Sequence, residues 1–221
     1  MELILASASP RRAELLTMAG LRFEQQPVDC DERWRPGEAP VDYARRVASA
    51  KLELAVAKLE LERAFASGST SASTSASGPT EVPLVLLSAD TTVWLDVARA
   101  PLGKPRDRDD ARAMLRELCA GRPHEVTTAC AIARRDPGRP ELWRRELVET
   151  TTVHMRELVG PAFDEFIEPH LDAGEWTDKA GGYAIQGRAA ALVTRIDGSY
   201  TSVVGLPLAQ VVDALAQEPT Q

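Results

Sequence analysis

Residues 85–89, VLLSA, form an almost continuous apolar run in which Ser88 is the one polar residue. A run of this kind is typical of a central strand that is buried on both faces of its sheet. Strand-like and helix-like patterns alternate along the rest of the chain, so helices are available to cover both faces of that sheet. This alternation predicts an α/β fold.

Local signals mark the other elements. Strands are predicted at residues 3–6, 124–135 and 143–155, and the stretches 181–187 and 190–200 are strand-like with glycine punctuation. Helices are predicted at residues 10–19, 41–65, 107–119, 161–171 and 205–217. Ser9, Asp107 and Pro207 stand at helix starts, and Pro169 should disturb the last turn of its helix. The acidic, turn-rich segment 25–40 is predicted as a loop.

A chain of 221 residues is long enough for one large domain or two small ones. A Ser/Thr/Ala/Gly tract at about residues 66–81 has no large apolar residue that burial could order, so it is predicted to be a flexible insertion. No apolar run approaches the roughly 20 residues of a membrane span, and the first apolar run is too short for a signal peptide. We therefore expect a cytoplasmic protein that does not bind a membrane.

The formal net charge of −7 at pH 7 argues against a general nucleic-acid binder, which normally carries a basic excess. It leaves room for a small anionic ligand in a locally basic cleft. The three cysteines form no paired motif and the three histidines lie far apart, so the sequence supports neither a disulfide framework nor a zinc site. The common glycine-rich nucleotide-binding loops and the serine hydrolase elbow are absent from the sequence too.

Two adjacent arginines follow a serine-proline pair in the segment SASPRR, residues 7–12. Because Ser9 is a good N-cap and Pro10 suits the first helical position, Arg11 and Arg12 should lie on the first turn of a helix. Cations there oppose the helix dipole, whereas the free N–H groups attract anions. Either a bound anion or simple solvation explains the pair, and this segment alone does not decide between them.

Three further places carry candidate chemistry. Asp90 follows the apolar run, and a strand end in an α/β sheet would place its carboxylate in the ligand crevice for metal or base work; a turn or helix cap is the alternative. Lys104 is rigidly presented in LGKP, facing a ligand or only solvent. Gln186 closes the glycine-rich block GEWTDKAGGYAIQG, and its amide can both donate to and accept from a base edge. The same block also contains Glu175, Asp178, Lys179 and Tyr183.

Six motifs, in order, resemble the Maf family of septum-formation-inhibitor-like proteins. They are SASPRR, SADT, LGKP, GRPHEVTT, GEWTDKAGGYAIQG and IDGSYTSVVGLPL, and they span nearly the whole chain outside the Ser/Thr tract. The SPRR form and the DKAGGYAIQG block are most similar to the dTTP/UTP pyrophosphatase subgroup. Mild departures from the family pattern are Thr92, Thr177, where an aromatic residue is usual, and Gly182, where alanine is common.

The resemblance implies roles for nine residues. Asp90 matches the family's proton acceptor. Positions that set substrate specificity are matched by Arg11, Thr91 and Gln186. Residues that line the triphosphate cleft are matched by Ser7, Arg12, Lys51 and Lys104. Glu32 matches an acidic residue near the metal, and Asp90 is the other implied metal ligand.

The resemblance also implies a single domain over residues 1–221. Its fold is expected to be a long twisted mixed sheet flanked by helices, with two lobes and a nucleotide cleft between them. The implied activity is that of a nucleoside triphosphate pyrophosphatase, a hydrolase that converts dTTP, UTP and related pyrimidine nucleotides to the monophosphate plus pyrophosphate, with Mg²⁺ or Mn²⁺. House-cleaning and cell-division arrest are candidate roles, and a homodimer is a candidate assembly. The 7-methyl-GTP branch of the same family and a nucleotide-binding regulator of septum formation remain alternatives.

Overall fold

The computed structural model describes residues 1–68, 82–139 and 141–217. Most of the insertion predicted at about residues 66–81 therefore lies outside the described residues. Its first three residues belong to helix α2, which runs to Gly68 and not to residue 65 as predicted. None of the described helices combines the length and the apolar character that a membrane crossing requires.

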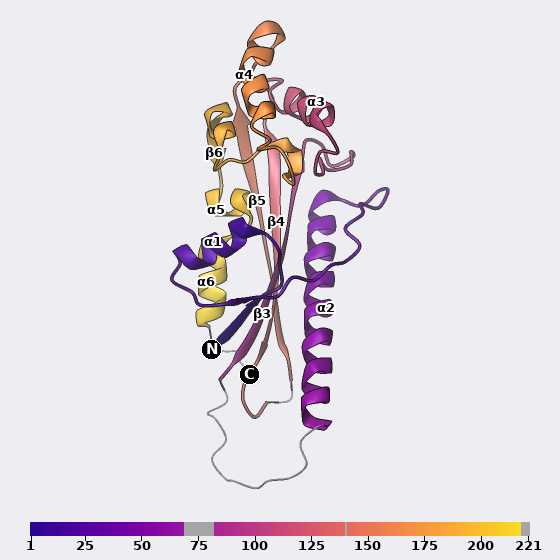
Figure 1. Ribbon diagram of the computed structural model, residues 1–221, viewed down its shortest axis with the longest axis vertical. Coiled ribbons are helices and arrows are strands. Elements are labelled where there is room, and N and C mark those ends of the chain that lie inside the picture. Colours follow the sequence, from indigo (N-terminus) through magenta and orange to yellow (C-terminus); the bar gives the residue numbers. More distant parts are fainter. Residues whose placement is uncertain (69–81, 140, 218–221) are drawn as a thin grey trace.

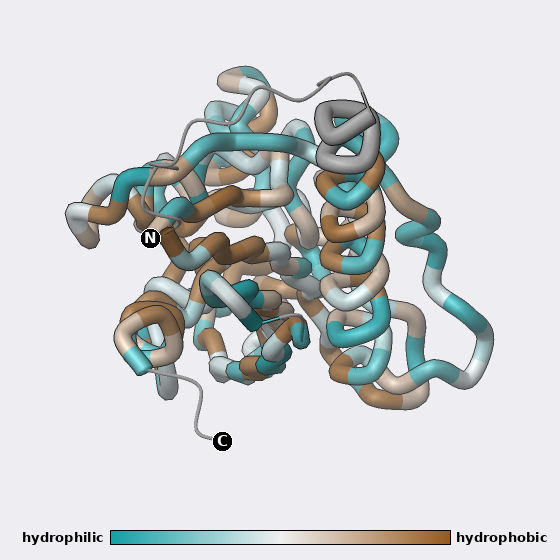
Figure 2. The backbone as a smooth tube through the Cα atoms, turned by 90° about the horizontal axis from the view of Figure 1, so that it is seen from below, coloured by the Kyte–Doolittle hydropathy of each residue, from teal (hydrophilic) through white to brown (hydrophobic). Residues whose placement is uncertain are grey.

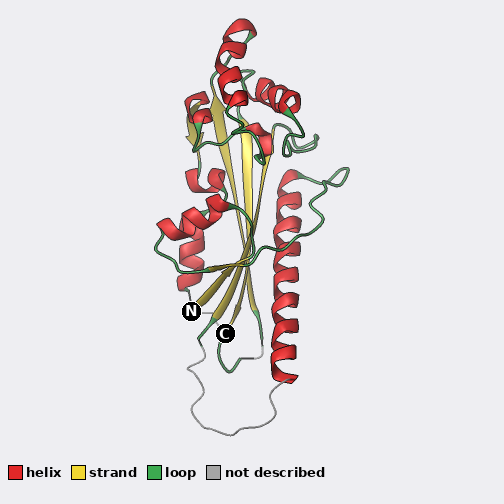
Figure 3. Cartoon of the chain, viewed as in Figure 1, coloured by secondary structure: helices red, strands yellow, loops and turns green. Residues whose placement is uncertain are grey.

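Within the described residues, six strands form one mixed sheet in the order β2-β1-β3-β4-β5-β6 (Figure 3). The strands are β1 (Glu2–Leu5), β2 (Glu24–Gln25), β3 (Leu84–Trp94), β4 (His124–Arg135), β5 (Trp143–Met155) and β6 (Val193–Asp197). Strand β1 pairs in parallel with β2 and β3, whereas β3 to β6 pair antiparallel. The predicted α/β class and mixed sheet are thereby confirmed.

Helices cover both faces of the sheet (Figure 1). The long helix α2 (Pro40–Gly68) lies along one side of it, and α1 (Pro10–Met18), α5 (Tyr200–Val204) and α6 (Leu208–Ala216) lie on the other. Toward the far end of the long strands lie α3 (Arg108–Leu118), α4 (Gly160–Asp172) and the short 3₁₀ turns η1 (Ala180–Gly182) and η2 (Arg188–Leu192). We call these two groups of elements the two lobes: one contains α1, α5 and α6, and the other contains α3, α4, η1 and η2.

Alanines make up much of the contact between α2 and the sheet. Ala44 and Ala48 of the helix are buried in one cluster with Ala129, Ala131 and Ala133 of β4. Small residues allow the helix backbone to approach the sheet, and the Ser88 hydroxyl donates to the Ala48 carbonyl at 2.7 Å. That bond accounts for the one polar residue in the apolar run, because a buried hydroxyl needs a partner. In Figure 2 the strands at the centre of the molecule are largely brown, which marks apolar residues, whereas many of the outer loops are teal, which marks hydrophilic ones.

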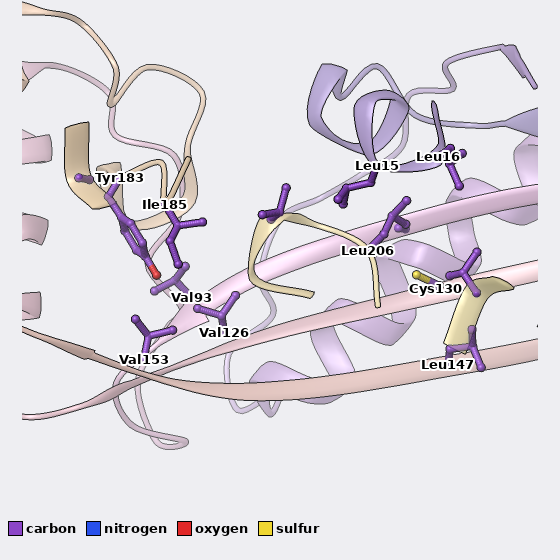
Figure 4. Packing of buried hydrophobic residues seen from close by; sticks show 14 of the residues in the cluster. Leu15, Leu16, Val93, Val126, Cys130, Leu147, Val153, Tyr183, Ile185 and Leu206 are labelled. Atoms are coloured by element: carbon purple, nitrogen blue, oxygen red, sulfur yellow. The ribbon is translucent and has the colours of Figure 1, made fainter. Parts of the chain in front are cut away.

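The opposite face of the sheet holds the larger cluster, which joins both lobes. Leu15 and Leu16 of α1 pack there beside Leu206, and Tyr183 and Ile185 pack beside Val93, Val126 and Val153 (Figure 4). Tyr183 and Ile185 come from the glycine-rich block. Their burial fixes that block against the sheet, although most of it has no regular structure.

Three predictions of local structure are wrong. Strand β3 continues to Trp94, so Asp90 lies within the strand and not after its end. Residues 181–187 form a 3₁₀ turn and a loop instead of a strand, because Gly181 and Gly182 both have positive φ. Residues 190–200 contain η2, β6 and the start of α5, of which only β6 is a strand. Strand β2 was also missed: Gln25 lies in the predicted loop, and Glu24 directly precedes it.

Candidate active site

A cleft of about 780 Å³ opens where the short strand β1 ends and β3 continues without it. Leu5 of β1 pairs with Leu87, so β3 beyond that residue has no β1 partner on this side. All nine residues implicated by the sequence line this cleft: Ser7, Arg11, Arg12, Glu32, Lys51, Asp90, Thr91, Lys104 and Gln186. The structure thus brings together residues from both lobes, and their individual roles stay predictions.

Alternation along β3 decides which way its polar side chains point. Leu84, Leu86 and Ser88 face α2, and so does Asp90, which reaches Lys51 on that helix. Thr91 points to the opposite face, toward α1. At the floor of the cleft, Asp90 therefore contacts Lys51 on one face of the sheet, and its neighbour Thr91 contacts Arg12 on the other.

Lys51 is placed between two carboxylates. Its Nζ lies 3.0 Å from Asp90 Oδ1 and 2.7 Å from Glu32 Oε1. Burial raises the pKa of Asp90 above its usual value, and the charges of Lys51 and Arg12 oppose that effect. Partial burial also acts to raise the pKa of Glu32, but Lys51, Lys104 and Arg12 together lower it. A buried carboxylate with a raised pKa is a stronger proton acceptor than an ordinary aspartate.

Arg12 is buried and holds three separate parts of the chain. Its Nε donates to the Gly205 carbonyl at 3.0 Å, its Nη1 to Ser7 Oγ at 2.9 Å, and its Nη2 to Thr91 Oγ1 at 3.1 Å. A guanidinium has five N–H donors, so two are left for a ligand. Ser9 stands at the N-cap of α1 as predicted, but its side chain does not make the capping bond.

The side chain of Arg11, the residue before Arg12, makes no ion pair or hydrogen bond with the described residues and lines the cleft. Burial lowers the pKa of Arg11, and the adjacent charge of Arg12 acts in the same direction. Lys104 is exposed on the opposite lobe, and Lys179 lies near Arg11. The cleft is therefore locally cationic in a protein whose net charge is negative.

Gln186 is exposed on the lining of the cleft, and the block that carries it is anchored from behind. Gly181 N donates to the Gly103 carbonyl at 3.1 Å, which ties the block to the loop of Lys104. The buried His170 ring contacts the Gly182 carbonyl at 3.1 Å. The Tyr183 hydroxyl contacts His124 Nε2 at 2.8 Å inside the core.

The structure separates the remaining candidates in that block. Asp178 and Lys179 line the cleft, whereas Glu175 accepts a hydrogen bond from the Arg188 backbone N–H and does not line it. Trp176 donates to the Leu171 carbonyl and also lies outside the lining.

Aromatic side chains that line the cleft include Trp34 and Tyr43, which sequence reasoning missed. Tyr43 lies on the same helix as Lys51, and Trp34 belongs to the preceding loop. Neither stands in one of the six motifs, so no local signal marked them.

The donor set in the cleft fits a divalent cation that also binds phosphate. Lys51 Nζ contacts one oxygen of each carboxylate, Glu32 Oε1 and Asp90 Oδ1, and the second oxygen of each makes no hydrogen bond or ion pair with the described residues. The described residues contain no group of three or more His, Cys, Asp or Glu side chains arranged for a metal. One or two carboxylates plus substrate phosphates are the usual coordination of Mg²⁺, so two protein oxygens suffice when the phosphates supply the others.

Cationic side chains from both lobes, the start of helix α1 and a buried carboxylate define an α/β protein whose cleft suits a polyphosphate ligand. The chain belongs to the Maf family: the family model, described as Maf-like protein, matches residues 2–218.

Two relatives are similar to this chain over almost its full length. The dTTP/UTP pyrophosphatase of Geobacter sp. (strain M21) is 42% identical over 213 residues, which is 96% of this chain and 93% of that protein. The dTTP/UTP pyrophosphatase of Cereibacter sphaeroides is 43% identical over 217 residues, which is 98% of this chain and 94% of that protein. A more distant solved structure, the Staphylococcus aureus Ham1 protein, covers 97% of both chains with a TM-score of 0.39 at 9% identity.

Proposed function

We propose that this protein hydrolyses dTTP and UTP to the nucleoside monophosphate and pyrophosphate, and that it uses Mg²⁺ or Mn²⁺. The proposal rests on one observation. Asp90, which is buried and paired with Lys51, lies in a cationic cleft that is lined by residues of both lobes. The names of the relatives specify the same reaction.

In this proposal the residues divide the work by charge. Arg11, Arg12 and Lys104 bind the triphosphate, and the charge that develops on the leaving pyrophosphate is stabilised by the same cations. Asp90 accepts the proton of the attacking water, since its carboxylate is the buried base of the cleft. A divalent cation held by Glu32 and Asp90 would shield phosphate charge and activate the water. Lys51 holds the two carboxylates in place.

Gln186 is proposed to read the base. Its amide can accept from the N3–H of uracil or thymine and donate to a neighbouring carbonyl, which gives two complementary bonds. A site built for such bonds rejects a base that leaves its polar groups unpaired. The proposed preference is therefore for pyrimidine nucleotides over 7-methyl-GTP.

The test is an assay of the purified protein with dTTP, UTP, dCTP, GTP and 7-methyl-GTP, each with Mg²⁺ or Mn²⁺ and with pyrophosphate and orthophosphate measured separately. We expect pyrophosphate and monophosphate from dTTP and UTP. Faster cleavage of 7-methyl-GTP would move the protein to the other branch of the family, and tight nucleotide binding without turnover would favour a binding regulator. Release of a nucleoside monophosphate and pyrophosphate requires attack at the α-phosphorus. Orthophosphate as the direct product would contradict this.

A further inference from the structure

We propose that Thr128, a buried residue of β4 that does not line the cleft, is a positioning residue: it orients Thr91 and, through Thr91, the guanidinium of Arg12. The proposal rests on the proposed function, because it concerns how that reaction's triphosphate is held. It adds a residue for which neither the sequence motifs nor the cleft lining gave a role.

Four groups form a chain of hydrogen bonds across the sheet. Arg12 Nη2 lies 3.1 Å from Thr91 Oγ1, and Thr91 Oγ1 lies 2.9 Å from Thr128 Oγ1. Thr128 Oγ1 in turn lies 2.7 Å from the Ser202 carbonyl oxygen in α5. Each donor in the chain can be assigned from chemistry alone.

The direction of the chain follows from what its ends can do. A carbonyl only accepts, so the single hydroxyl hydrogen of Thr128 goes to Ser202. Thr91 must therefore donate to Thr128, because Thr128 has no second hydrogen. Arg12 only donates, so it supplies the hydrogen that Thr91 accepts. Every hydroxyl in the chain thus donates once and accepts once, and the chain has one polarity.

This polarity restricts Thr91. Its hydrogen is committed to Thr128, so Thr91 cannot donate to a base carbonyl or a phosphate while the chain is intact. Its oxygen remains oriented to accept from Arg12. The predicted effect of Thr91 on substrate selection would then be exerted through the placement of Arg12.

Thr128 is fully buried, and removal of its hydroxyl leaves both neighbours without their partner. A Thr128→Val variant keeps the shape of the side chain but offers neither donor nor acceptor. The Thr91 hydroxyl then loses its acceptor and is free to rotate, and the Arg12 guanidinium loses a fixed oxygen. We expect Arg12 to become less well ordered although no residue of the cleft has been changed.

The neighbouring residue provides a matched control. Thr127 is also fully buried in β4, and its hydroxyl is hydrogen-bonded to Trp94 Nε1 at 3.0 Å and to Thr150 Oγ1 at 2.8 Å. That network does not include Arg12, and Thr127 does not line the cleft. Thr127→Val therefore removes a comparable buried hydroxyl without affecting the proposed chain.

The experiment compares Thr128→Val, Thr128→Ser and Thr127→Val in the full chain. The readouts are kcat and KM for dTTP, calorimetric titration with inorganic tripolyphosphate, and hydrogen exchange of the Arg12 Nε–H by NMR. We expect Thr128→Val to lower kcat/KM about tenfold, the scale of one well-placed hydrogen bond, to weaken tripolyphosphate binding and to speed exchange at Arg12. Thr128→Ser, which keeps the hydroxyl, and Thr127→Val should retain wild-type values.

Equal losses in Thr128→Val and Thr127→Val, or unchanged Arg12 exchange in Thr128→Val, would overturn the proposal. If Thr128→Val does not fold, Thr128→Cys replaces it, because a thiol is a weak donor of similar size. A wild-type protein that releases no pyrophosphate from any nucleotide would refute the proposed function, and tripolyphosphate binding and Arg12 exchange would still decide the role of Thr128.

Discussion

Lys51 determines the charge balance in the floor of the cleft. Its ammonium contacts Asp90 and Glu32, and the Lys51 and Asp90 side chains are almost wholly buried. Two carboxylates that face one point repel each other unless a cation lies between them. Lys51 supplies that cation, and it also couples the long helix α2 to the centre of β3.

The first prediction concerns Asp90 itself. Asp90→Asn keeps the shape of the side chain but removes the proton acceptor, so we expect kcat for dTTP to fall by roughly 100-fold or more. Asp96→Asn, at the exposed turn after β3, is the control and should retain wild-type turnover. Near-normal turnover of Asp90→Asn would remove this residue from the mechanism.

The second prediction concerns the pH dependence of the rate. Asp90 accepts a proton only when ionised, so activity should be lost as the pH falls through its pKa, which burial places above the usual 3.8. The charge of Lys51 lowers that pKa. Lys51→Met should therefore move the acidic limb of the kcat/KM profile to higher pH as well as lower the rate.

The control for this experiment is Lys58→Met, since Lys58 is an exposed lysine of the same helix. Its acidic limb should coincide with that of the wild type. An acidic limb in Lys51→Met that stays in place, or moves to lower pH, would contradict the assignment of this limb to Asp90.

At the scale of elements, the glycine-rich block is a loop whose shape depends on its contacts. Gly181 has a φ of +71°, and a Cβ on it would lie 3.3 Å from Val93 Cγ1 and 3.4 Å from Leu118 Cδ1. Gly174 also has a positive φ, of +68°, but nothing lies within 4 Å of the position of its Cβ. An alanine at either position would strain the backbone, but only an alanine at position 181 would also crowd its neighbours.

The third prediction uses that difference. Gly174→Ala should cost about 1 kcal/mol from the left-handed backbone alone. Gly181→Ala should cost about 1–3 kcal/mol more, because the added methyl meets packed side chains. Thermal melts measure both, and KM for dTTP should rise only in Gly181→Ala, whose displacement reaches Gln186. Equal melting temperatures for the two variants would show that the block is not tightly packed.

Helices and long strands were predictable because their signals are local. The apolar run before Asp90, the N-cap at Asp107 and the alternating patterns of β4 and β5 all lie within their own segments. The extension of β3 through Asp90, Thr91 and Thr92 was not predictable in this way. Polar residues there read as a strand end, but β4 pairs with β3 as far as Trp94 and supplies the backbone partners.

In the candidate site, too, the sequence predicted the residues but not the contacts between them. Seven of the nine residues that meet in the cleft stand in motifs of one family, and Glu32 and Lys51 were added through the wider resemblance to that family. Spacing along the chain did not place any of them together. Their partnerships could not be named: the contact of Arg12 with Gly205 and that of Lys51 with both carboxylates depend on the assembled sheet. Tyr43 and Trp34 lie outside every motif, so only the structure places them on the lining.

At the scale of the whole molecule, His124 links the pH to stability. Burial, with a smaller effect of His154, lowers the pKa of His124 to about 4 from a usual 6.5. Between these values the unfolded chain binds a proton that the folded protein does not. The free energy of unfolding should therefore decrease as the pH falls through this window, by about 3 kcal/mol in full.

The fourth prediction follows from that linkage. Urea unfolding of the wild type and of His124→Gln, measured at several values between pH 7 and pH 4, should give a shallower decrease for the variant. Groups that titrate elsewhere are common to both proteins, so the difference in slope reports on His124. Parallel slopes would mean that this histidine has nearly the same pKa in the folded and unfolded states.

The bond from Arg12 Nε to the Gly205 carbonyl joins residues 193 positions apart in the chain. A polypeptide is synthesised from its N-terminus at about 5–20 residues per second, so Arg12 waits on the order of ten seconds or more before its acceptor is made. The SASPRR motif therefore exists early in synthesis, but the Arg12 guanidinium is held in place only when the chain is nearly complete. An unfinished or prematurely released chain therefore has Arg12 without the Gly205 carbonyl that holds its guanidinium.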